Sequence, residues 1–191
     1  MSVGFYIDMT RCTGCRACQV ACKDKNRLDV GTVYRNAHSF SVGSFPNVKG
    51  YAFSASCNHC EMPACMAACS AGAIDKAEDG AVIIDQSKCT GCKACLEACP
   101  YAIPQFLEEE GVAGKCDSCQ MIRSKGGQPA CVAGCPNRAL DFGEIEELKA
   151  KYGDALVSDI AILPGSETTK PNLLIKAKDA AMEEGFVEIA W

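Results

Sequence analysis

The sequence predicts an α+β fold made of two copies of a small cysteine-rich module, with extra covering loops and a C-terminal extension. Three observations lead to this prediction. All 16 cysteines of the 191 residues fall into four groups of four. The groups alternate between two kinds of surrounding sequence, which indicates an internal duplication. Short apolar runs ahead of the groups predict strands, and alanine-rich runs inside the groups predict short helices.

The predicted strands are short and lie close to the cysteines. Apolar runs at residues 5–7, 51–55 and 82–84 precede three of the groups, and residues 173–175 form a late strand after Pro171. Asp79-Gly80 is a typical turn pair, so residues 73–85 are expected to form a hairpin. Residues 24–50 and 157–172 are loop-rich, and we expect them to cover the modules.

The predicted helices run through the cysteine groups. Residues 17–23, 64–68, 94–98 and 130–134 are small and apolar apart from their cysteines, which favours one or two helical turns each. Residues 144–151 change from acidic to basic with helical spacing, as an ordinary surface helix does.

The composition favours bound metal over disulfides. Without the cysteines the apolar fraction is modest, so we expect metal centres to help stabilise a thin core. Residues 1–8 have neither the positive start nor the apolar stretch of a secretory signal, so we expect no signal peptide in this chain. In a reducing compartment, 16 cysteines indicate metal ligands.

Charge and hydropathy exclude two classes of partner. The 19 basic and 24 acidic residues give a formal net charge of −5, and no basic run favours nucleic acid. No uncharged apolar stretch reaches the roughly 18 residues that a membrane span requires, so we expect no direct membrane span.

The spacing within the groups indicates the kind of metal centre. The first and third groups read C-x2-C-x2-C-x3-C, the second C-x2-C-x4-C-x3-C and the fourth C-x2-C-x11-C-x3-C. In bacterial ferredoxins the first of these spacings wraps three thiolates around one 4Fe–4S cube, and its last cysteine reaches a neighbouring cluster. A four-cysteine zinc site would leave the third cysteine of each such run without a role. The groups are Cys12, Cys15, Cys18 and Cys22; Cys57, Cys60, Cys65 and Cys69; Cys89, Cys92, Cys95 and Cys99; and Cys116, Cys119, Cys131 and Cys135.

The spacing leaves open which groups share clusters. Residues 11–22 echo 88–99, and residues 63–75 echo 129–141, so the chain repeats in the order A, B, A, B. The gaps at 70–88 and 100–115 are both short enough to pair the second group with the third, or the third with the fourth. The first choice leaves the first group with the fourth and closes the chain around a central module.

The chain resembles the four-cluster iron–sulfur subunit of molybdenum enzymes of the DMSO reductase family. The matching stretches cover nearly the whole chain, and the last of them contains no cysteine. They are Gly4-Phe-Tyr-Ile-Asp8, Arg11-Cys-Thr-Gly-Cys15, Ser56-Cys-Asn-His-Cys60, Lys115-Cys-Asp-Ser-Cys119, Arg138-Ala-Leu-Asp-Phe-Gly143 with Glu146-Glu-Leu148, and Thr169-Lys-Pro-Asn172. Subunits of polysulfide, tetrathionate and arsenate reductases share most of these motifs, and the DMSO reductase type fits best.

The resemblance implies how the cysteines are shared among four 4Fe–4S clusters. In this family the first group pairs with the fourth and the second with the third. Residues 1–23 plus 110–156 would then form one ferredoxin-like module, residues 51–109 the other, and residues 24–50 and 157–191 the covering loop and C-terminal extension. The implied ligand sets are Cys12, Cys15, Cys18 and Cys135 (site 1); Cys22, Cys116, Cys119 and Cys131 (site 2); Cys57, Cys60, Cys65 and Cys99 (site 3); and Cys69, Cys89, Cys92 and Cys95 (site 4).

The resemblance also implies partners and a location. The family places a molybdopterin cofactor on a large catalytic subunit and usually adds a membrane anchor that oxidises quinol. Such iron–sulfur subunits either stay cytoplasmic, or are membrane-associated and cross the membrane already folded with their catalytic partner. Two alternatives remain open: a free polyferredoxin that carries electrons between several enzymes, and the same subunit in a soluble molybdenum hydroxylase or dehydroxylase of aromatic compounds.

The remaining polar residues form no catalytic constellation, so we expect a non-catalytic electron-transfer chain. The sequence has two histidines and no nucleotide-binding fingerprint. For His59, between Cys57 and Cys60, we expect packing or a hydrogen bond near sulfur rather than ligation. His38 lies in an expected loop. Four lysines beside cysteines could raise cluster potentials or be ordinary solvated lysines: Lys23, Lys88, Lys93 and Lys115.

Overall fold

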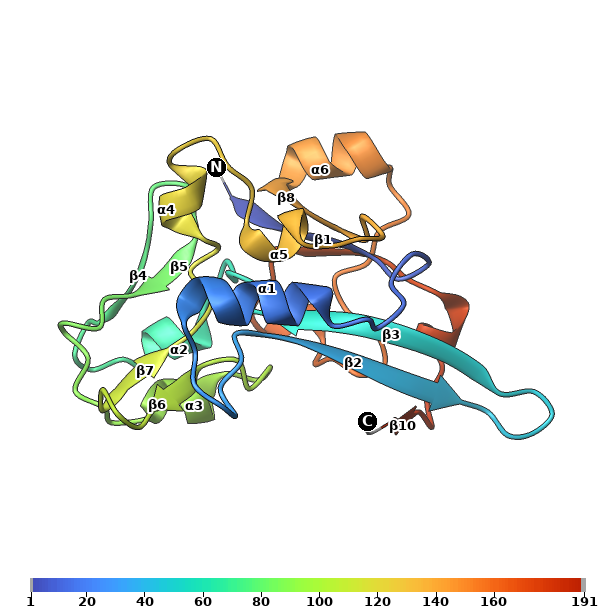
Figure 1. The fold of residues 1–191 in the computed structure, drawn as a ribbon, viewed down its shortest axis with the longest axis horizontal. Coiled ribbons are helices and arrows are strands. Elements are labelled where there is room, and N and C mark those ends of the chain that lie inside the picture. Colours follow the sequence, from blue (N-terminus) through green and yellow to red (C-terminus); the bar gives the residue numbers. More distant parts are fainter. Residues whose placement is uncertain (1, 190–191) are drawn as a thin grey trace.

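Within residues 2–189, the computed structural model contains two three-stranded sheets and two two-stranded hairpins, connected by short helices (Figure 1). Residue 1 of the expected first module and residues 190–191 of the expected extension lie outside this described range. The elements are β1 (Val3–Asp8), α1 (Ala17–Asn26), β2 (Arg35–Val42), β3 (Lys49–Ser56), α2 (Ala64–Ala67), β4 (Ile74–Lys76), β5 (Val82–Ile84), α3 (Ala94–Ala98), β6 (Gln105–Leu107), β7 (Val112–Gly114), α4 (Gln120–Arg123), α5 (Ala130–Ala133), β8 (Leu140–Glu144), α6 (Ile145–Tyr152), η1 (Ser166–Thr168), β9 (Leu173–Lys176), η2 (Asp179–Met182) and β10 (Val187–Glu188).

The first sheet joins the two ends of the chain. Its order is β8-β1-β9, with β1 antiparallel to β8 and parallel to β9. Every residue of β1 is buried, because Phe5 and Ile7 face the main core while Tyr6, on the other face, packs against Leu148 of α6. The strand before the first cysteine group therefore lies beside the strand after the fourth group, and the expected C-terminal extension supplies the third strand.

A smaller pair of strands has the corresponding position in the middle of the chain. The hairpin β4–β5 pairs Ile74 with Ile84 across an Asp79-Gly80 turn. Strand β4 begins five residues after Cys69, and β8 begins five residues after Cys135. The segments that repeat in sequence thus begin equivalent strands, and the expected hairpin over residues 73–85 is confirmed.

The second sheet corrects one expectation. Residues 35–42 were expected to be part of a covering loop over 24–50, but they form β2, which pairs along its whole length with β3. The short β10 then pairs with the other edge of β2. The signal for β2 is weak because five of its eight residues are Arg, Asn, His or Ser; pairing with β3 makes the segment regular. Figure 1 shows this hairpin extending beyond the rest of the molecule.

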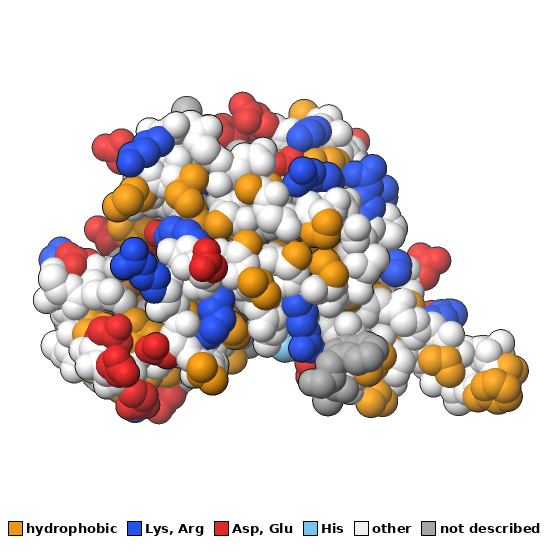
Figure 2. All heavy atoms as spheres, viewed as in Figure 1, with side chains coloured by type: hydrophobic (Ala, Val, Ile, Leu, Met, Phe, Trp, Pro, Cys, Tyr) orange, Lys and Arg blue, Asp and Glu red, His pale blue; other side chains and the backbone are white. Residues whose placement is uncertain are grey.

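The tip of the β2–β3 hairpin is hydrophobic. Phe45 is 91% exposed and Val48 is 55% exposed, and Figure 2 shows a mainly hydrophobic surface at this end of the molecule. Nearer the body, Phe40 packs against Tyr51 with ring centroids 5.3 Å apart. The base of the hairpin is thus held by aromatic contacts, while its tip projects into solvent.

The expected helices form, α3 with the predicted bounds and the others with shifts of one to three residues at their ends. α1 continues to Asn26, and α6 runs over Ile145–Tyr152 rather than 144–151.

The main core combines apolar side chains such as Phe5 and Ile175 with cysteines, so the cysteines are part of the packing rather than a separate surface feature. None of the helices in residues 2–189 has the length and apolarity of a membrane span.

Candidate iron–sulfur sites

The two C-x2-C-x2-C runs form separate loops that have the same backbone conformation. Gly14 and Gly91 both have φ of +70°, and the residues two positions later, Arg16 and Lys93, have φ of 62° and 63°. A Cβ on Gly91 would lie 2.4 Å from the carbonyl oxygen of Gly111, so only glycine fits there. Each loop places its first two cysteines just before the helix that carries the third, Cys18 on α1 and Cys95 on α3.

Three separate cavities are each lined by four cysteines. They are of the same small size, about 20 Å³ each. In each cavity three cysteines come from one group and the fourth from another group. The cysteines around them are Cys12, Cys15, Cys18 and Cys135; Cys57, Cys60, Cys65 and Cys99; and Cys69, Cys89, Cys92 and Cys95.

The remaining four cysteines gather where α1 meets α5 and the segment after β7. Cys116, Cys119 and Cys131 are all buried, and so is Cys22. Burial, together with the neighbouring sulfurs of Cys131 and Cys119, raises the pKa of the Cys22 thiol to about 12. The structure therefore brings together the four cysteines that no other cavity uses.

Burial makes two thiols of site 3 hard to ionise without a nearby cation. It raises the pKa of Cys65 to about 12 and that of Cys60 to about 11. A thiolate is the form that binds metal, and a bound cation is what lowers such a pKa in a dry site. The donor set is soft, convergent and water-poor, which fits an iron–sulfur cluster.

Backbone N–H groups point at several of the sulfurs. The N–H of Ala73 donates to Cys69 Sγ and that of Ala139 to Cys135 Sγ, both at 3.3 Å. These two bonds occupy equivalent positions in the repeat. A third donor, the N–H of Ser118, lies 3.3 Å from Cys116 Sγ. Such bonds stabilise negative charge on sulfur and so influence cluster potential.

His59 packs between two cysteine sets. It is completely buried, and its Nδ1 accepts a hydrogen bond from the N–H of Val82 at 3.0 Å. In the neutral ring the proton is therefore on Nε2, which lies 3.9 Å from Cys116 Sγ. Burial lowers the pKa of His59 well below its ordinary value, and the Lys115 cation lowers it further. His38, expected in a loop, is instead on β2, 2.5 Å from a carboxylate oxygen of Glu188.

Sequence reasoning missed one residue of these sites and left another undecided. Arg35, in the segment expected to be a loop, is only 1% exposed, and arginine is so rarely buried that no sequence signal indicated it. Lys115 is 6% exposed, whereas the side chains of Lys88 and Lys93 are 63% and 49% exposed. Of these three lysines, Lys115 alone is not a solvated surface residue.

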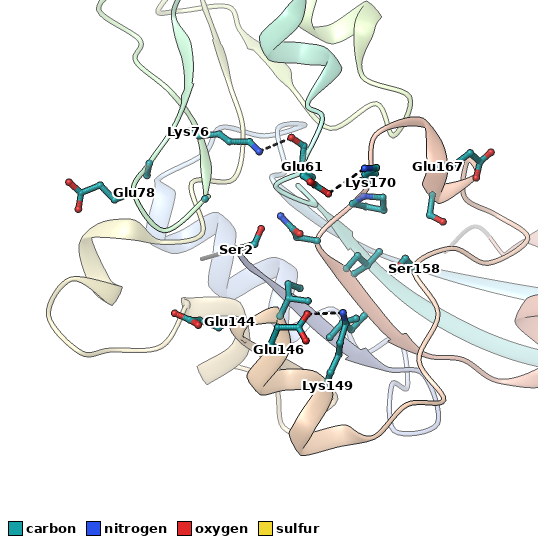
Figure 3. A pocket seen from close by; sticks show the side chains of 18 residues that line it. Ser2, Glu61, Lys76, Glu78, Glu144, Glu146, Lys149, Ser158, Glu167 and Lys170 are labelled. Carbon is teal, nitrogen blue, oxygen red and sulfur yellow. Dashed lines mark hydrogen bonds and ion pairs between the residues drawn. The ribbon is translucent and has the colours of Figure 1, made fainter.

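A wide polar groove of about 950 Å³ lies apart from the cysteines, between the β4–β5 hairpin, α6 and the segment before β9 (Figure 3). No cysteine lines it. Glu61 bridges two of its walls, because its carboxylate lies 3.9 Å from Lys170 Nζ and its carbonyl accepts from Lys76 Nζ at 2.7 Å. Glu146 and Lys149 pair across one turn of α6.

The loops and the cysteine sets define a protein of the 4Fe–4S class, and comparison with protein families agrees. A family model described as a 4Fe-4S dicluster domain matches residues 48–145, and one described as a 4Fe-4S binding domain matches residues 9–31. The first match includes the second, third and fourth cysteine groups.

Curated relatives place the sequence more narrowly within this class. It is 45% identical over 181 residues to the B subunit of anaerobic dimethyl sulfoxide reductase of Escherichia coli K12, a match that covers 91% of this chain and 87% of the relative. The corresponding B subunit of Haemophilus influenzae is 41% identical over 191 residues, covering 95% and 92%. A thiosulfate reductase electron transfer subunit of Salmonella typhi is 39% identical over 148 residues, covering 73% and 74%. The protein belongs to the family of iron–sulfur subunits of DMSO-reductase-type complexes, as its motifs predicted.

Proposed function

We propose that the protein is a non-catalytic electron-transfer subunit that passes single electrons through four 4Fe–4S clusters. The observation that carries the proposal is the set of three cavities of similar size, each with four converging cysteines. Together with the fourth set, they match the four ligand sets that the resemblance implies. Thiolates would hold the irons, and the clusters would supply reversible one-electron chemistry.

The helices support a row of sites rather than a scattered arrangement. α1 carries Cys18 of site 1 and ends its cysteine run at Cys22 of site 2. α2 and the residues after it likewise connect Cys65 of site 3 with Cys69 of site 4. Lys115 and His59 lie between sites 2 and 3. We infer that the sites lie in the order 1-2-3-4. In this order sites 1 and 2 form one copy of the duplicated module, and sites 3 and 4 form the other.

The ends of this row are the sites nearest the surface. Among the 16 cysteines, Cys15 of site 1 and Cys92 of site 4 are the exposed ones. An electron can tunnel to another protein only over a short distance, so terminal sites have to approach the surface. Exposure at these two positions therefore suits a protein that receives electrons at one end and delivers them at the other.

The proposed partner is a large catalytic subunit that carries a molybdopterin cofactor. The relatives' names describe a B subunit of dimethyl sulfoxide reductase and an electron transfer subunit of thiosulfate reductase. By analogy, this chain would connect such a catalytic subunit with a membrane anchor that oxidises quinol, in anaerobic respiration. The complex would be either cytoplasmic or exported folded.

Anaerobic purification from the native host through this chain tests the proposal. We expect about sixteen iron atoms per copy of the chain, in addition to any held by a partner, and a large molybdenum-containing chain that co-purifies. The same iron content without a stable partner and without molybdenum would indicate a free polyferredoxin. An iron content far below this, with zinc in its place, would contradict the proposed clusters.

Two substitutions on α1 test how the cysteines are shared. Cys22→Ser should damage the cluster held by Cys116, Cys119 and Cys131, while the matched Cys18→Ser should damage the site that includes Cys135. Iron content and the spectrum of each remaining cluster, measured by electron paramagnetic resonance (EPR), separate the two results. Damage by Cys22→Ser to the site of Cys12 and Cys15 would show that ligands are not exchanged between groups.

A further inference from the structure

Arg35 is a fully buried cation that has no carboxylate partner among residues 2–189. Its guanidinium donates to the carbonyl oxygen of Ser54 at 3.0 Å and to the hydroxyl of Ser56 at 2.7 Å, and it lies 4.3 Å from the centre of the Phe5 ring. Its Nε has no hydrogen-bond partner in the described part of the chain. Arginine remains protonated even when buried, so this positive charge is permanent.

Lys115 is a second buried cation of this kind. Its Nζ donates to the carbonyl oxygens of Val82 and of Cys116, the latter at 3.2 Å, and lies 3.5 Å from Cys57 Sγ. No carboxylate of the described residues pairs with it. The acceptors around it match an ammonium group with three donors.

Buried charges without a counter-charge are strongly destabilising, and hydrogen bonds to neutral groups only partly offset this. The anionic groups near each cation therefore identify its partner. The sulfurs that interact with the charge of Arg35 are Cys131, Cys116 and Cys22 of site 2 and Cys18 of site 1. The Ser54 hydroxyl, which accepts from the guanidinium at 3.1 Å, lies 3.3 Å from Cys18 Sγ. The sulfurs near Lys115 are Cys57, Cys65 and Cys99, all of site 3.

The lysines near site 4 are exposed, in contrast to the buried Arg35 and Lys115. Lys88 lies 3.4 Å from Asp85, and Lys93 lies 3.8 Å from Glu108. Each therefore has a carboxylate partner, and water and salt screen what charge remains. Sites 2 and 3 thus each have an unscreened cation of the protein beside them, and Arg35 also borders site 1 through Cys18, whereas site 4 has no such cation among the described residues.

Resting on the proposed function, we propose that Arg35 and Lys115 are internal counter-charges that raise the reduction potentials of the clusters at sites 2 and 3. A cluster gains one negative charge when it is reduced, so a nearby cation stabilises the reduced form more than the oxidised form. The charge pattern makes the middle of the row a better electron acceptor than it would be without these residues. Both act through the clusters and are positioning residues for electron transfer.

The test is a redox titration followed by EPR on the anaerobically purified protein with its co-purifying partners. The variants are Arg35→Gln and Lys115→Met, with the charge-conserving Arg35→Lys and Lys115→Arg, and Lys88→Met as an exposed control. Signals of sites 2 and 3 are assigned from their loss in Cys131→Ser and Cys65→Ser.

We expect each neutral variant to lower the potential of its own site. At the potential where that site is half reduced in the unmodified protein, its ratio of reduced to oxidised cluster should fall at least tenfold, which corresponds to about 59 mV for one electron. The charge-conserving variants should restore most of this ratio, and Lys88→Met should leave every site unchanged.

The outcomes separate this inference from the proposed function. An unmodified protein without four clusters would contradict the proposed function before any variant is compared. Four intact clusters with unchanged potentials in both neutral variants would overturn the counter-charge proposal alone. Loss of a cluster in Arg35→Gln but not in Arg35→Lys would support a need for charge. Loss of the cluster in both would assign Arg35 a purely structural role and overturn its part of the proposal.

Discussion

Asp141 connects three elements through a single carboxylate. It lies on β8 and accepts from Lys151 Nζ at 2.7 Å and from the Tyr152 hydroxyl at 2.6 Å, both at the end of α6. The Tyr152 ring stacks on Tyr6 of β1, with centroids 3.6 Å apart. This carboxylate therefore fixes the angle at which α6 packs on the first sheet.

Replacing this carboxylate should weaken the protein in a way that depends on pH. Burial raises the pKa of Asp141, but hydrogen bonds from Lys151 and Tyr152 outweigh burial and leave the pKa below its ordinary value. A lowered pKa contributes stability at neutral pH that is lost as pH falls through the unfolded-state value of about 3.9 and below. We expect Asp141→Asn to cost about 1 kcal/mol of unfolding free energy at pH 7.

Anaerobic thermal unfolding between pH 7 and pH 2 measures this, because the contribution is lost mainly below the unfolded-state pKa of about 3.9. The difference between the unmodified protein and Asp141→Asn should be largest at pH 7 and shrink below about pH 5. The equivalent aspartate of the other repeat, the exposed Asp75, is the matched control, and Asp75→Asn should change little. A difference for Asp141→Asn that stays constant over this range would rule out the charge as its cause.

Gly4 lies where β1 and the backbone before β9 come too close for a side chain. A Cβ there would be 2.1 Å from the carbonyl oxygen of Asn172 and 2.6 Å from the Ile145 side chain. Gly4→Ala should therefore cost about 1–3 kcal/mol through overpacking. Gly50→Ala, whose Cβ would meet its nearest atom at 3.8 Å, is the control from another strand. Equal melting temperatures for the two variants would contradict the close contact.

At the residue scale, cysteine spacing predicted far more than the other side chains did. Metal ligands have strict local geometry, so their spacing is visible in the sequence. Arg35 and Lys115 are different, because their burial depends on residues such as Ser54 and Val82 that are distant in the sequence. No local pattern distinguishes a buried lysine from an exposed one.

At the scale of elements, helices α1 and α5 contact each other through small residues. A Cβ on Gly134 would lie 2.9 Å from Ala21 Cβ, so the end of α5 touches α1 directly. The same two helices and their flanks carry cysteines of the first and second sites, Cys18 and Cys22 on α1 and Cys131 on α5. The distance between the two helices therefore determines whether the cysteines of both sites can come together.

A large side chain at position 134 should separate these helices. We expect Gly134→Leu to reduce iron from about sixteen to about eight atoms per chain, because sites 1 and 2 depend on this contact while sites 3 and 4 do not. Ala133→Leu, one residue earlier and exposed, should keep the full iron content. The iron content of the anaerobically purified variants tests this prediction. A uniform loss of iron from all four sites would show that sites 1 and 2 do not assemble separately from sites 3 and 4.

Most elements could be predicted, including α6 and β9, which lie away from the cysteines, but strand β2 and the β6–β7 hairpin could not. α3 (Ala94–Ala98) and β5 (Val82–Ile84) form with the predicted bounds, because short-range pattern and tertiary structure agree there. Strand β2 was missed because its polar residues carry little strand propensity, and its partner β3 supplies the regular hydrogen bonding. The β6–β7 hairpin was missed as well, since its strands have only three residues each.

For the molecule as a whole, the clusters should be part of the fold rather than bound to a finished one. Sulfurs, two buried cations and apolar side chains share the same interior. Removing iron would leave Arg35 and Lys115 buried without counter-charge, at about 3–5 kcal/mol each. We expect cluster removal with a chelator to abolish cooperative thermal unfolding followed by circular dichroism. An iron-free protein that melts cooperatively at the original temperature would contradict this.

The pairing of β1 with β8 has a consequence for biosynthesis. A ribosome releases the polypeptide from its N-terminus, and segments fold as they become complete. In the proposed ligand sets the central module has its last cysteine at Cys99, but Cys12 would wait for Cys135, which lies just before β8, the strand that pairs with β1. The first cysteines to be synthesised therefore belong to the last site to be finished. Until then they would be reactive thiols in a growing polypeptide, and an iron-loading factor that acts during translation would find sites 3 and 4 ready first.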